Sequence, residues 1–141
     1  LSELIDGVIE DVRFGHAGQP LRIDFSGDEA ILVTAHAGAL RSAIENVIHN
    51  AVIHGGSEVH VSLEQEGEHA ILSVTDSGGG VDAGELDRLF EPFFRATKSG
   101  ATEGTGLGLA IAARALAMHD GTITARNVEP GLRVEMRLPV A

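Results

Sequence analysis

The sequence predicts an α+β fold in two layers, in which a mixed, mostly antiparallel sheet packs against three main helices on one of its faces. The first observation behind this prediction is the order of the periodic segments: a helix, two strands, a helix, two strands, an irregular segment, a helix and two final strands. The second is that short turns join the paired strands, which favours antiparallel pairing over a strictly alternating parallel sheet. The 141 residues suit a single domain with a substantial core.

The first three segments are a helix and two candidate strands. Residues 1–14 place apolar side chains at helical spacing, and Ser2 is a candidate N-terminal cap. Residues 21–25 alternate between apolar and charged side chains, as in a half-buried strand. Residues 30–34 form a second short apolar run after a Gly-Asp turn. We therefore expect a hairpin between these two runs.

The middle of the chain contains the second helix and the second strand pair. Residues 38–53 carry apolar side chains at helical spacing, and Gly55-Gly56 fits a left-handed stop at the end of this helix. Residues 59–63 and 70–74 are strand-like runs joined by a polar turn, which predicts a hairpin.

The remaining elements surround a long irregular segment. Residues 81–106 are long for a connection in a compact domain, and a loop of this length is usually functional or disordered. Within it we expect one short helix, from residue 82 or 83 to residue 90. A third long helix and the last strand pair follow this segment, at residues 107–118, 122–125 and 132–138.

The composition excludes several classes of function. The formal net charge is −11, from 10 basic and 21 acidic residues, so a basic face for nucleic acid is not expected. The absence of cysteine excludes disulfides, thiol nucleophiles and cysteine zinc sites. Glycine occurs 18 times, and eight of these residues lie between Gly78 and Gly108. Such clustering indicates turns or a close approach to a ligand.

An acidic, glycine-rich motif follows the strand at residues 70–74. In Asp76-Ser77-Gly78-Gly79-Gly80, the carboxylate can accept a hydrogen bond from an exocyclic amine, and the glycines let the backbone pass close to a flat ring. For this motif alone, a structural turn in which Asp76 bonds its own backbone is the simpler interpretation.

A second glycine-rich motif opens the third long helix. Gly104-Thr105-Gly106-Leu107-Gly108 lies where the unpaired N–H groups and the positive dipole end of a helix favour phosphate. The motif matches neither the dinucleotide-binding fingerprint nor a Walker loop. By itself it is weak evidence for a phosphate site.

Two asparagines lie on one face of the second helix. Asn46 and Asn50 are four residues apart, and Glu45 and His54 flank this face. An amide oxygen suits Mg²⁺, and an amide N–H can contact phosphate. Solvation at the edge of the helix is an equally good interpretation of this pair alone.

Aromatic and cationic side chains gather within the irregular segment. Phe90-Glu91-Pro92-Phe93-Phe94-Arg95 contains three of the five phenylalanines, which indicates a hydrophobic anchor or a partner surface. Arg95 and Lys98 are the only cations between Arg88 and Arg114, and both can reach phosphate oxygens. The alternative is that they are solvated loop charges.

The order of these motifs is more specific than any one of them. The segments ENVIHNAVIH, DSGGG, FEPFFR and GTGLGLA, with the closing HDGTITARN and GLRVEMRLP, resemble the ATP-binding catalytic domain of sensor histidine kinases. That family is related to the gyrase, heat-shock chaperone and mismatch-repair ATPases. The resemblance covers about residues 1–139 and implies the Bergerat-type ATP-binding fold.

The resemblance also implies a role for each motif. The asparagine box would hold catalytic Asn46 and Asn50, with Asn50 as the Mg²⁺ ligand. Asp76 would bind the adenine amino group, with Gly78 and Gly80 giving the base room. A phenylalanine box would anchor an ATP lid over about residues 81–106, and it would consist of Phe90, Phe93 and Phe94. Glycines of the lid hinge would donate backbone N–H groups to phosphates: Gly104, Gly106 and Gly108. The implied ATP-binding set also includes His54, Val81, Phe94, Arg95, Lys98, Thr105 and Leu107.

The chain departs from the family pattern at two points. The family often has Lys-Tyr after the asparagine box, where this chain has Ile53-His54, so contact with phosphate passes to His54, Arg95 or Lys98. In addition, none of the seven histidines has the sequence context of the family's phosphoacceptor. We therefore expect the acceptor histidine on a separate helical hairpin of a longer receptor.

The resemblance further implies partners and a location. The γ-phosphoryl group of ATP would pass to the hairpin histidine and then to a response regulator. We expect this segment to be monomeric by itself and cytoplasmic, within a homodimeric parent of a type that is often anchored in the inner membrane.

Two other classes of function stay open at this point. A related domain could act as a protein serine kinase or as a dimerising ATPase. The ATPases place a water-activating acid at the first position of the asparagine box, where this chain has Asn46, with Glu45 about 100° round the helix. A non-catalytic module that docks a protein is the second alternative.

Overall fold

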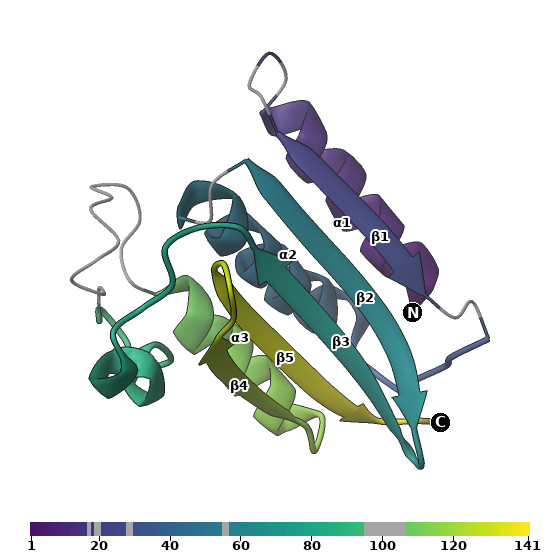
Figure 1. Cartoon of the computed structure of the whole chain (residues 1–141). Coiled ribbons are helices and arrows are strands. Elements are labelled where there is room, and N and C mark those ends of the chain that lie inside the picture. The colour runs from purple at the N-terminus through teal and green to yellow at the C-terminus, as the bar shows by residue number, and fades with distance from the viewer. Residues whose placement is uncertain (17, 19–20, 28–29, 55–56, 95–106) are drawn as a thin grey trace.

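Five strands form one mixed sheet in the order β1-β2-β3-β5-β4 (Figure 1). The computed structural model describes residues 1–16, 18, 21–27, 30–54, 57–94 and 107–141. The described elements are α1 (Ser2–Gly15), β1 (Arg22–Gly27), α2 (Ala37–His54), β2 (Glu58–Glu66), β3 (His69–Asp76), η1 (Ala83–Arg88), α3 (Gly108–Met118), β4 (Thr122–Asn127) and β5 (Leu132–Pro139). Among the described strands, β1 and β2 pair in parallel and the other three neighbouring pairs are antiparallel, so the predicted sheet type is confirmed.

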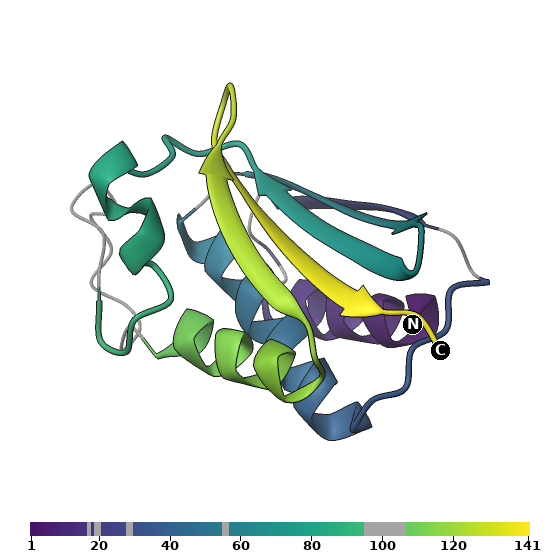
Figure 2. The ribbon, with the colours of Figure 1, turned by 90° about the horizontal axis from the view of Figure 1, so that it is seen from below.

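The three α-helices of the described residues lie together on one face of the sheet, as predicted (Figure 2). Ile44 of α2, Leu116 of α3 and Leu72 of β3 are each at most 1 % exposed and belong to one core. The opposite face is polar, and there the Arg133 guanidinium donates a 3.0 Å hydrogen bond to the Ser73 hydroxyl. An apolar face against the helices and a polar face on the other side are typical of a sheet that is covered on one side. None of the described helices combines the length and the hydropathy needed to cross a membrane.

The predicted hairpin between residues 21–25 and 30–34 is wrong. β1 takes its partner from β2, and the second run forms no strand. This run leads from β1 towards α2: Ile31 is 1 % exposed, and the carbonyl of Leu32 accepts a 2.8 Å hydrogen bond from the Ala141 amide. Parallel neighbours need a long crossover, which α2 supplies, and the apolar content of the run reflects the burial of Ile31.

The predicted cap of α1 is also wrong. Leu1 occupies the cap position without a side-chain hydrogen bond, and Ser2 lies inside the helix and is buried. The Ile5 amide donates to the carbonyl of Leu1 at 3.1 Å, so the cap lies one residue before the predicted one.

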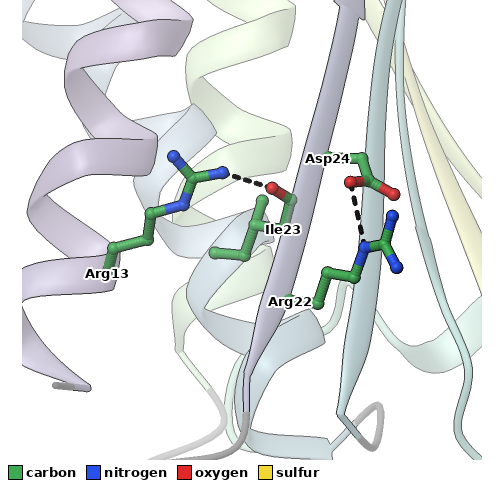
Figure 3. A network of polar contacts seen from close by, with 4 residues as sticks. All are labelled: Arg13, Arg22, Ile23 and Asp24. Atoms are coloured by element: carbon green, nitrogen blue, oxygen red, sulfur yellow. Dashed lines mark hydrogen bonds and ion pairs between the residues drawn. The ribbon is translucent and has the colours of Figure 1, made fainter. Parts of the chain in front are cut away.

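A hydrogen bond joins α1 to the edge strand β1 (Figure 3). The Arg13 guanidinium of α1 donates to the backbone carbonyl of Ile23. On β1 itself, Arg22 and Asp24 form an exposed ion pair at 3.3 Å. The edge strand is thus joined both to β2 and to the helix that covers it.

The remaining boundaries lie within a few residues of the prediction. The second and third long helices are α2 and α3, and the two later strand pairs are β2–β3 and β4–β5. The short helix of the irregular segment is the 3₁₀ helix η1. The stop predicted at Gly55-Gly56 lies outside the described residues.

Two histidines join the start of α2 to the end of α3. The Nδ1 atom of His36 accepts a 3.1 Å hydrogen bond from the Ala39 amide and so caps α2. The His36 amide in turn donates to Nε2 of His119 at 3.0 Å. This contact joins the N-terminal end of α2 to the C-terminal end of α3. The site described next lies at the opposite ends of these two helices.

Candidate nucleotide-binding site

A buried carboxylate marks the end of β3. Asp76 is 7 % exposed, and its Oδ1 atom accepts hydrogen bonds from the amides of Gly78 at 3.0 Å and Leu132 at 3.1 Å. The next residue, Ser77, still pairs with the start of β2, since its amide donates to the Glu58 carbonyl at 3.1 Å. The carboxylate is therefore held by its own turn and by the first residue of β5.

Burial raises the pKa of Asp76 above its ordinary value of 3.8. The hydrogen bonds from Gly78 and Leu132 and the charge of His54 lower the pKa and offset part of this effect. The influence of His54 shows that the end of α2 lies near the end of β3. The structure thus brings together two residues that the sequence separates by 22 positions.

The glycine turn after Asp76 is fastened to the end of β4. The Oδ1 atom of Asn127 accepts from the Val81 amide at 2.8 Å, and its Nδ2 donates to the Val81 carbonyl at 2.5 Å. Gly80 has φ +74°, and a Cβ there would lie 2.6 Å from Oδ1 of Asn127. Both backbone groups of Val81, a predicted ATP-binding residue, are therefore bonded within the protein.

A second glycine presses against the carboxylate from the turn between β4 and β5. Gly131 has φ +104°, and a Cβ at this position would lie 1.9 Å from the carbonyl oxygen of Asp76 and 2.8 Å from its Oδ1. Sequence reasoning treated Gly131 only as part of a turn and missed both it and Asn127. The one available signal was the resemblance of HDGTITARN and GLRVEMRLP to the family's closing hairpin.

A polar stripe runs along α2 between the two glycine motifs. Asn46, Asn50 and His54 are spaced by four residues, are all half-buried, and share one face of the helix. Eight residues of α-helix span about 12 Å. Glu45 is exposed and lies off this stripe.

The N-terminus of α3 lies against the first residue of this stripe. A Cβ on Gly108 would lie 3.3 Å from Oδ1 of Asn46, so the two helices approach closely here. Leu107 caps the helix, and its carbonyl accepts from the Ile111 amide at 2.9 Å. The first-turn amides of α3 have no partner within the helix ladder, as at every helix start.

The predicted phenylalanine anchor is only partly packed. Phe90 and Phe94 are half-buried and lie against the core, and the Arg88 guanidinium carbon sits 4.5 Å from the centroid of the Phe94 ring. Phe93 is 71 % exposed and has φ +66°. Two of the three phenylalanines thus fasten the segment that follows η1.

The rest of the predicted phosphate side lies outside the described residues: Arg95, Lys98, Gly104, Thr105 and Gly106. Within the described part of the chain, no group of three or more histidine, aspartate or glutamate side chains is placed to hold a metal ion. A metal here would need amide and ligand oxygens.

Comparison with known proteins agrees with this geometry. The family model "Histidine kinase-, DNA gyrase B-, and HSP90-like ATPase" matches residues 35–141. The chain is 38 % identical over 134 residues to the sensor protein PfeS of Pseudomonas aeruginosa, which covers 94 % of this chain and 30 % of PfeS. It is 39 % identical over 120 residues to the sensor histidine kinase YvrG of Bacillus subtilis, covering 82 % of this chain and 21 % of YvrG.

Solved structures lead to the same family. The mycobacterial sensor histidine kinase MprB superposes with a TM-score of 0.92 at 29 % identity, covering 99 % of this chain and 95 % of that one. The ATP-binding domain of PrrB from Mycobacterium tuberculosis superposes with a TM-score of 0.79 at 28 % identity, covering 99 % and 93 %. The chain therefore belongs to the histidine kinase-, DNA gyrase B-, and HSP90-like ATPase family, as an ATP-binding catalytic domain of the sensor histidine kinase type.

Proposed function

We propose that this domain binds ATP with Mg²⁺ and donates the γ-phosphoryl group to a histidine outside this chain. The observation that carries the proposal is the polar stripe of α2, which connects the carboxylate of Asp76 to the N-terminus of α3. One end of the stripe suits a base and the other suits phosphates. The chain spans only 30 % of PfeS and 21 % of YvrG, so the acceptor belongs to the rest of the parent protein.

The base side of the site centres on Asp76. Both hydrogen bonds from Gly78 and Leu132 end on Oδ1, so we assign Oδ2 to the exocyclic amine of adenine. Burial of this carboxylate strengthens a hydrogen bond that it makes, because water competes less. Gly78 and Gly80 leave room for the flat ring beside the turn.

The phosphate side centres on the N-terminus of α3. The unpaired amides of its first turn and the positive end of its dipole attract phosphate oxygens. Gly108 lies beside Asn46, so the side-chain carboxamide of Asn46 can contact the same phosphates. We infer that this side is completed by further residues of the lid and its hinge: Arg95, Lys98, Gly104, Thr105, Gly106 and Leu107.

The metal site that fits these residues is an open one. Asn50 offers a hard amide oxygen, and Mg²⁺ commonly keeps several waters and binds through one or two protein oxygens together with phosphates. When bound, Mg²⁺ would neutralise phosphate charge in a domain whose own net charge is −11. The charge of His54 acts on Asp76, so we infer that His54 lies beside the base or ribose and leaves the phosphates to other residues.

The transfer itself requires mainly positioning. An imidazole nitrogen of the acceptor attacks the γ-phosphorus, the bond from that phosphorus to the bridging oxygen breaks, and ADP leaves. The described residues hold the base and orient the phosphates outward. The exposure of Glu45, off the stripe, gives no support to a water-activating acid of the ATPase kind.

Calorimetry with and without Mg²⁺ tests binding, and transfer of a radiolabelled γ-phosphoryl group to the parent's helical hairpin tests catalysis. We expect ATP to bind more tightly with Mg²⁺ and the label to reach the hairpin only when its histidine is present. Absence of ATP binding would overturn the proposal. Labelling of a hairpin that lacks histidine would favour a serine kinase. The parent's homodimer and its response regulator are expected partners, which cross-linking and phosphotransfer from the labelled parent would test.

A further inference from the structure

Asn127 is the last residue of the edge strand β4 and of the segment HDGTITARN, and it makes a paired contact to which the sequence motifs assign no role. Its carboxamide bonds both backbone groups of Val81, with N···O distances of 2.8 and 2.5 Å, across 46 positions of sequence. A carboxamide carries the same donor and acceptor pair as a peptide group. The Asn127 side chain therefore bonds Val81 as a neighbouring strand would, although Val81 is not part of a strand.

The hairpin that carries Asn127 also holds the other end of the glycine turn. The Val128 amide donates to the Gly131 carbonyl at 2.9 Å and closes the hairpin, and the Leu132 amide donates to Oδ1 of Asp76 at 3.1 Å. The turn from Ser77 to Val81 is thus fastened at its start through Asp76 and at its end through Asn127. Both points of attachment belong to the β4–β5 hairpin.

The backbone around this contact leaves little room for a side chain at Gly80. A Cβ at Gly80 would lie 2.6 Å from Oδ1 of Asn127 and 3.2 Å from the carbonyl oxygen of Gly131. As a whole residue, Asn127 is exposed and lies outside the hydrophobic core. Its polar contact with Val81, and not packing, is therefore what its side chain contributes.

We propose that Asn127 is a positioning residue for nucleotide binding. It holds the turn from Ser77 to Val81 in the position that lets the Asp76 carboxylate bond the base. This inference rests on the proposed function of the site. The residue does not touch the ligand itself. It acts through the backbone of Val81 on the turn that shapes the base side.

Two variants of Asn127 separate this role from general stability. Asn127→Ala removes both hydrogen bonds, and the isosteric Asn127→Asp keeps an acceptor for the Val81 amide but sets a carboxylate oxygen against the Val81 carbonyl. Thr124→Ala, on the same strand and also exposed, is the matched control. Each protein is titrated with Mg²⁺-ATP and with Mg²⁺-ITP, whose base has a carbonyl in place of the amine. Hydrogen exchange of the Val81 amide and thermal unfolding are measured on the same samples.

We expect both Asn127 variants to bind ATP about tenfold more weakly, the loss that one or two neutral hydrogen bonds represent. Their preference for ATP over ITP should fall as well, because the displaced turn weakens the hydrogen bond between the Asp76 carboxylate and the adenine amine. A general loss of stability, at a temperature well below unfolding, would leave that preference unchanged. Exchange of the Val81 amide should become faster, and Thr124→Ala should match the parent chain in every readout.

Three results would overturn the inference. The first is unchanged ATP affinity and base preference in Asn127→Ala although Val81 exchanges faster. The second is unchanged exchange of Val81, which would show that the contact does not protect it. The third is an unaltered chain that binds no ATP, which would remove the proposed function itself. The first two leave ATP binding by the unaltered chain intact, so the two kinds of failure are distinguishable.

Discussion

The amide of Leu132 donates a 3.1 Å hydrogen bond to Oδ1 of Asp76, although 56 residues separate the two in sequence. Together with the 3.0 Å bond from Gly78, it orients the carboxylate before any ligand arrives. The orientation determines which oxygen is left for the base, and this makes the exchange of Asp76 for asparagine informative.

Asp76→Asn should reverse the base preference of the site. The new side chain must turn its oxygen towards the Gly78 and Leu132 amides, so its NH₂ group faces the adenine amine, donor against donor. We expect ATP affinity to fall about 100-fold, and ITP, which offers an acceptor, to lose much less. Calorimetry with both nucleotides measures this. Asp24→Asn, an exposed carboxylate on β1, is the control that should bind as the parent chain does. Equal losses for ATP and ITP would contradict the assignment of Asp76 to the amine.

The raised pKa of Asp76 predicts how ATP binding depends on pH. The ionised carboxylate accepts from the amine more strongly than the protonated acid does, so ATP affinity should fall as the pH is lowered through a value above 3.8. Calorimetry over this range, with Asp76→Asn as the reference for titration of the nucleotide itself, isolates the effect. A fall of the same size in the variant would show that Asp76 is not the titrating group.

The same pKa shift predicts a change in stability. The folded chain binds this proton more tightly than the unfolded chain does, so the contribution of Asp76 to the free energy of unfolding decreases as the pH rises from 3.8 through the folded pKa. Asp76→Asn lacks this titration. Its stability relative to the parent chain should therefore increase over that pH window, as measured by urea unfolding. A relative stability that does not change with pH, or that decreases, would contradict the prediction.

Gly131→Ala should disturb the carboxylate through its backbone. The added Cβ would lie 1.9 Å from the Asp76 carbonyl oxygen, so the hairpin must shift away from the end of β3. Gly67→Ala is a matched control, since Gly67 has φ +62° with nothing within 4 Å of the added Cβ. We expect the control to lose about 1 kcal/mol of stability from backbone strain alone, and Gly131→Ala to lose more and to bind ATP more weakly. Similar losses of stability and affinity in both variants would show that the contact with Asp76 does not matter.

Asn50→Ala should weaken binding of ATP mainly when Mg²⁺ is present. The substitution removes the amide oxygen that we assign to the metal but leaves Asp76 and the α3 N-terminus in place. Paired titrations with Mg²⁺ and with a chelator measure the difference, and Ser42→Ala, an exposed position on the same helix, is the control. Equal loss in the two conditions would remove Asn50 from the metal site.

Much of the fold and of the candidate site could be predicted because the signals are local. The spacing of apolar residues located α2, α3 and the two later strand pairs, and the four ordered motifs indicated the family. Ser2 and residues 30–34 were misread for the same reason: a cap and a strand depend on which partners the backbone meets, and local composition does not state this. The expectation that Phe93 packs as part of the anchor has the same weakness, since Phe93 is 71 % exposed in the structure.

The sequence by itself determined the layered α+β class, the acidic glycine turn, the asparagine face of α2 and the glycine-opened start of α3. The class follows from the order of the periodic segments along the chain, and each of the other three features depends on residues within a few positions of one another. Only the tertiary structure decided that His54 lies near Asp76, that Gly108 meets Asn46, and that the β4–β5 hairpin fastens both ends of the glycine turn. These contacts join residues 22 to 62 positions apart. They arise from the packing of whole elements, so no local pattern in the chain records them.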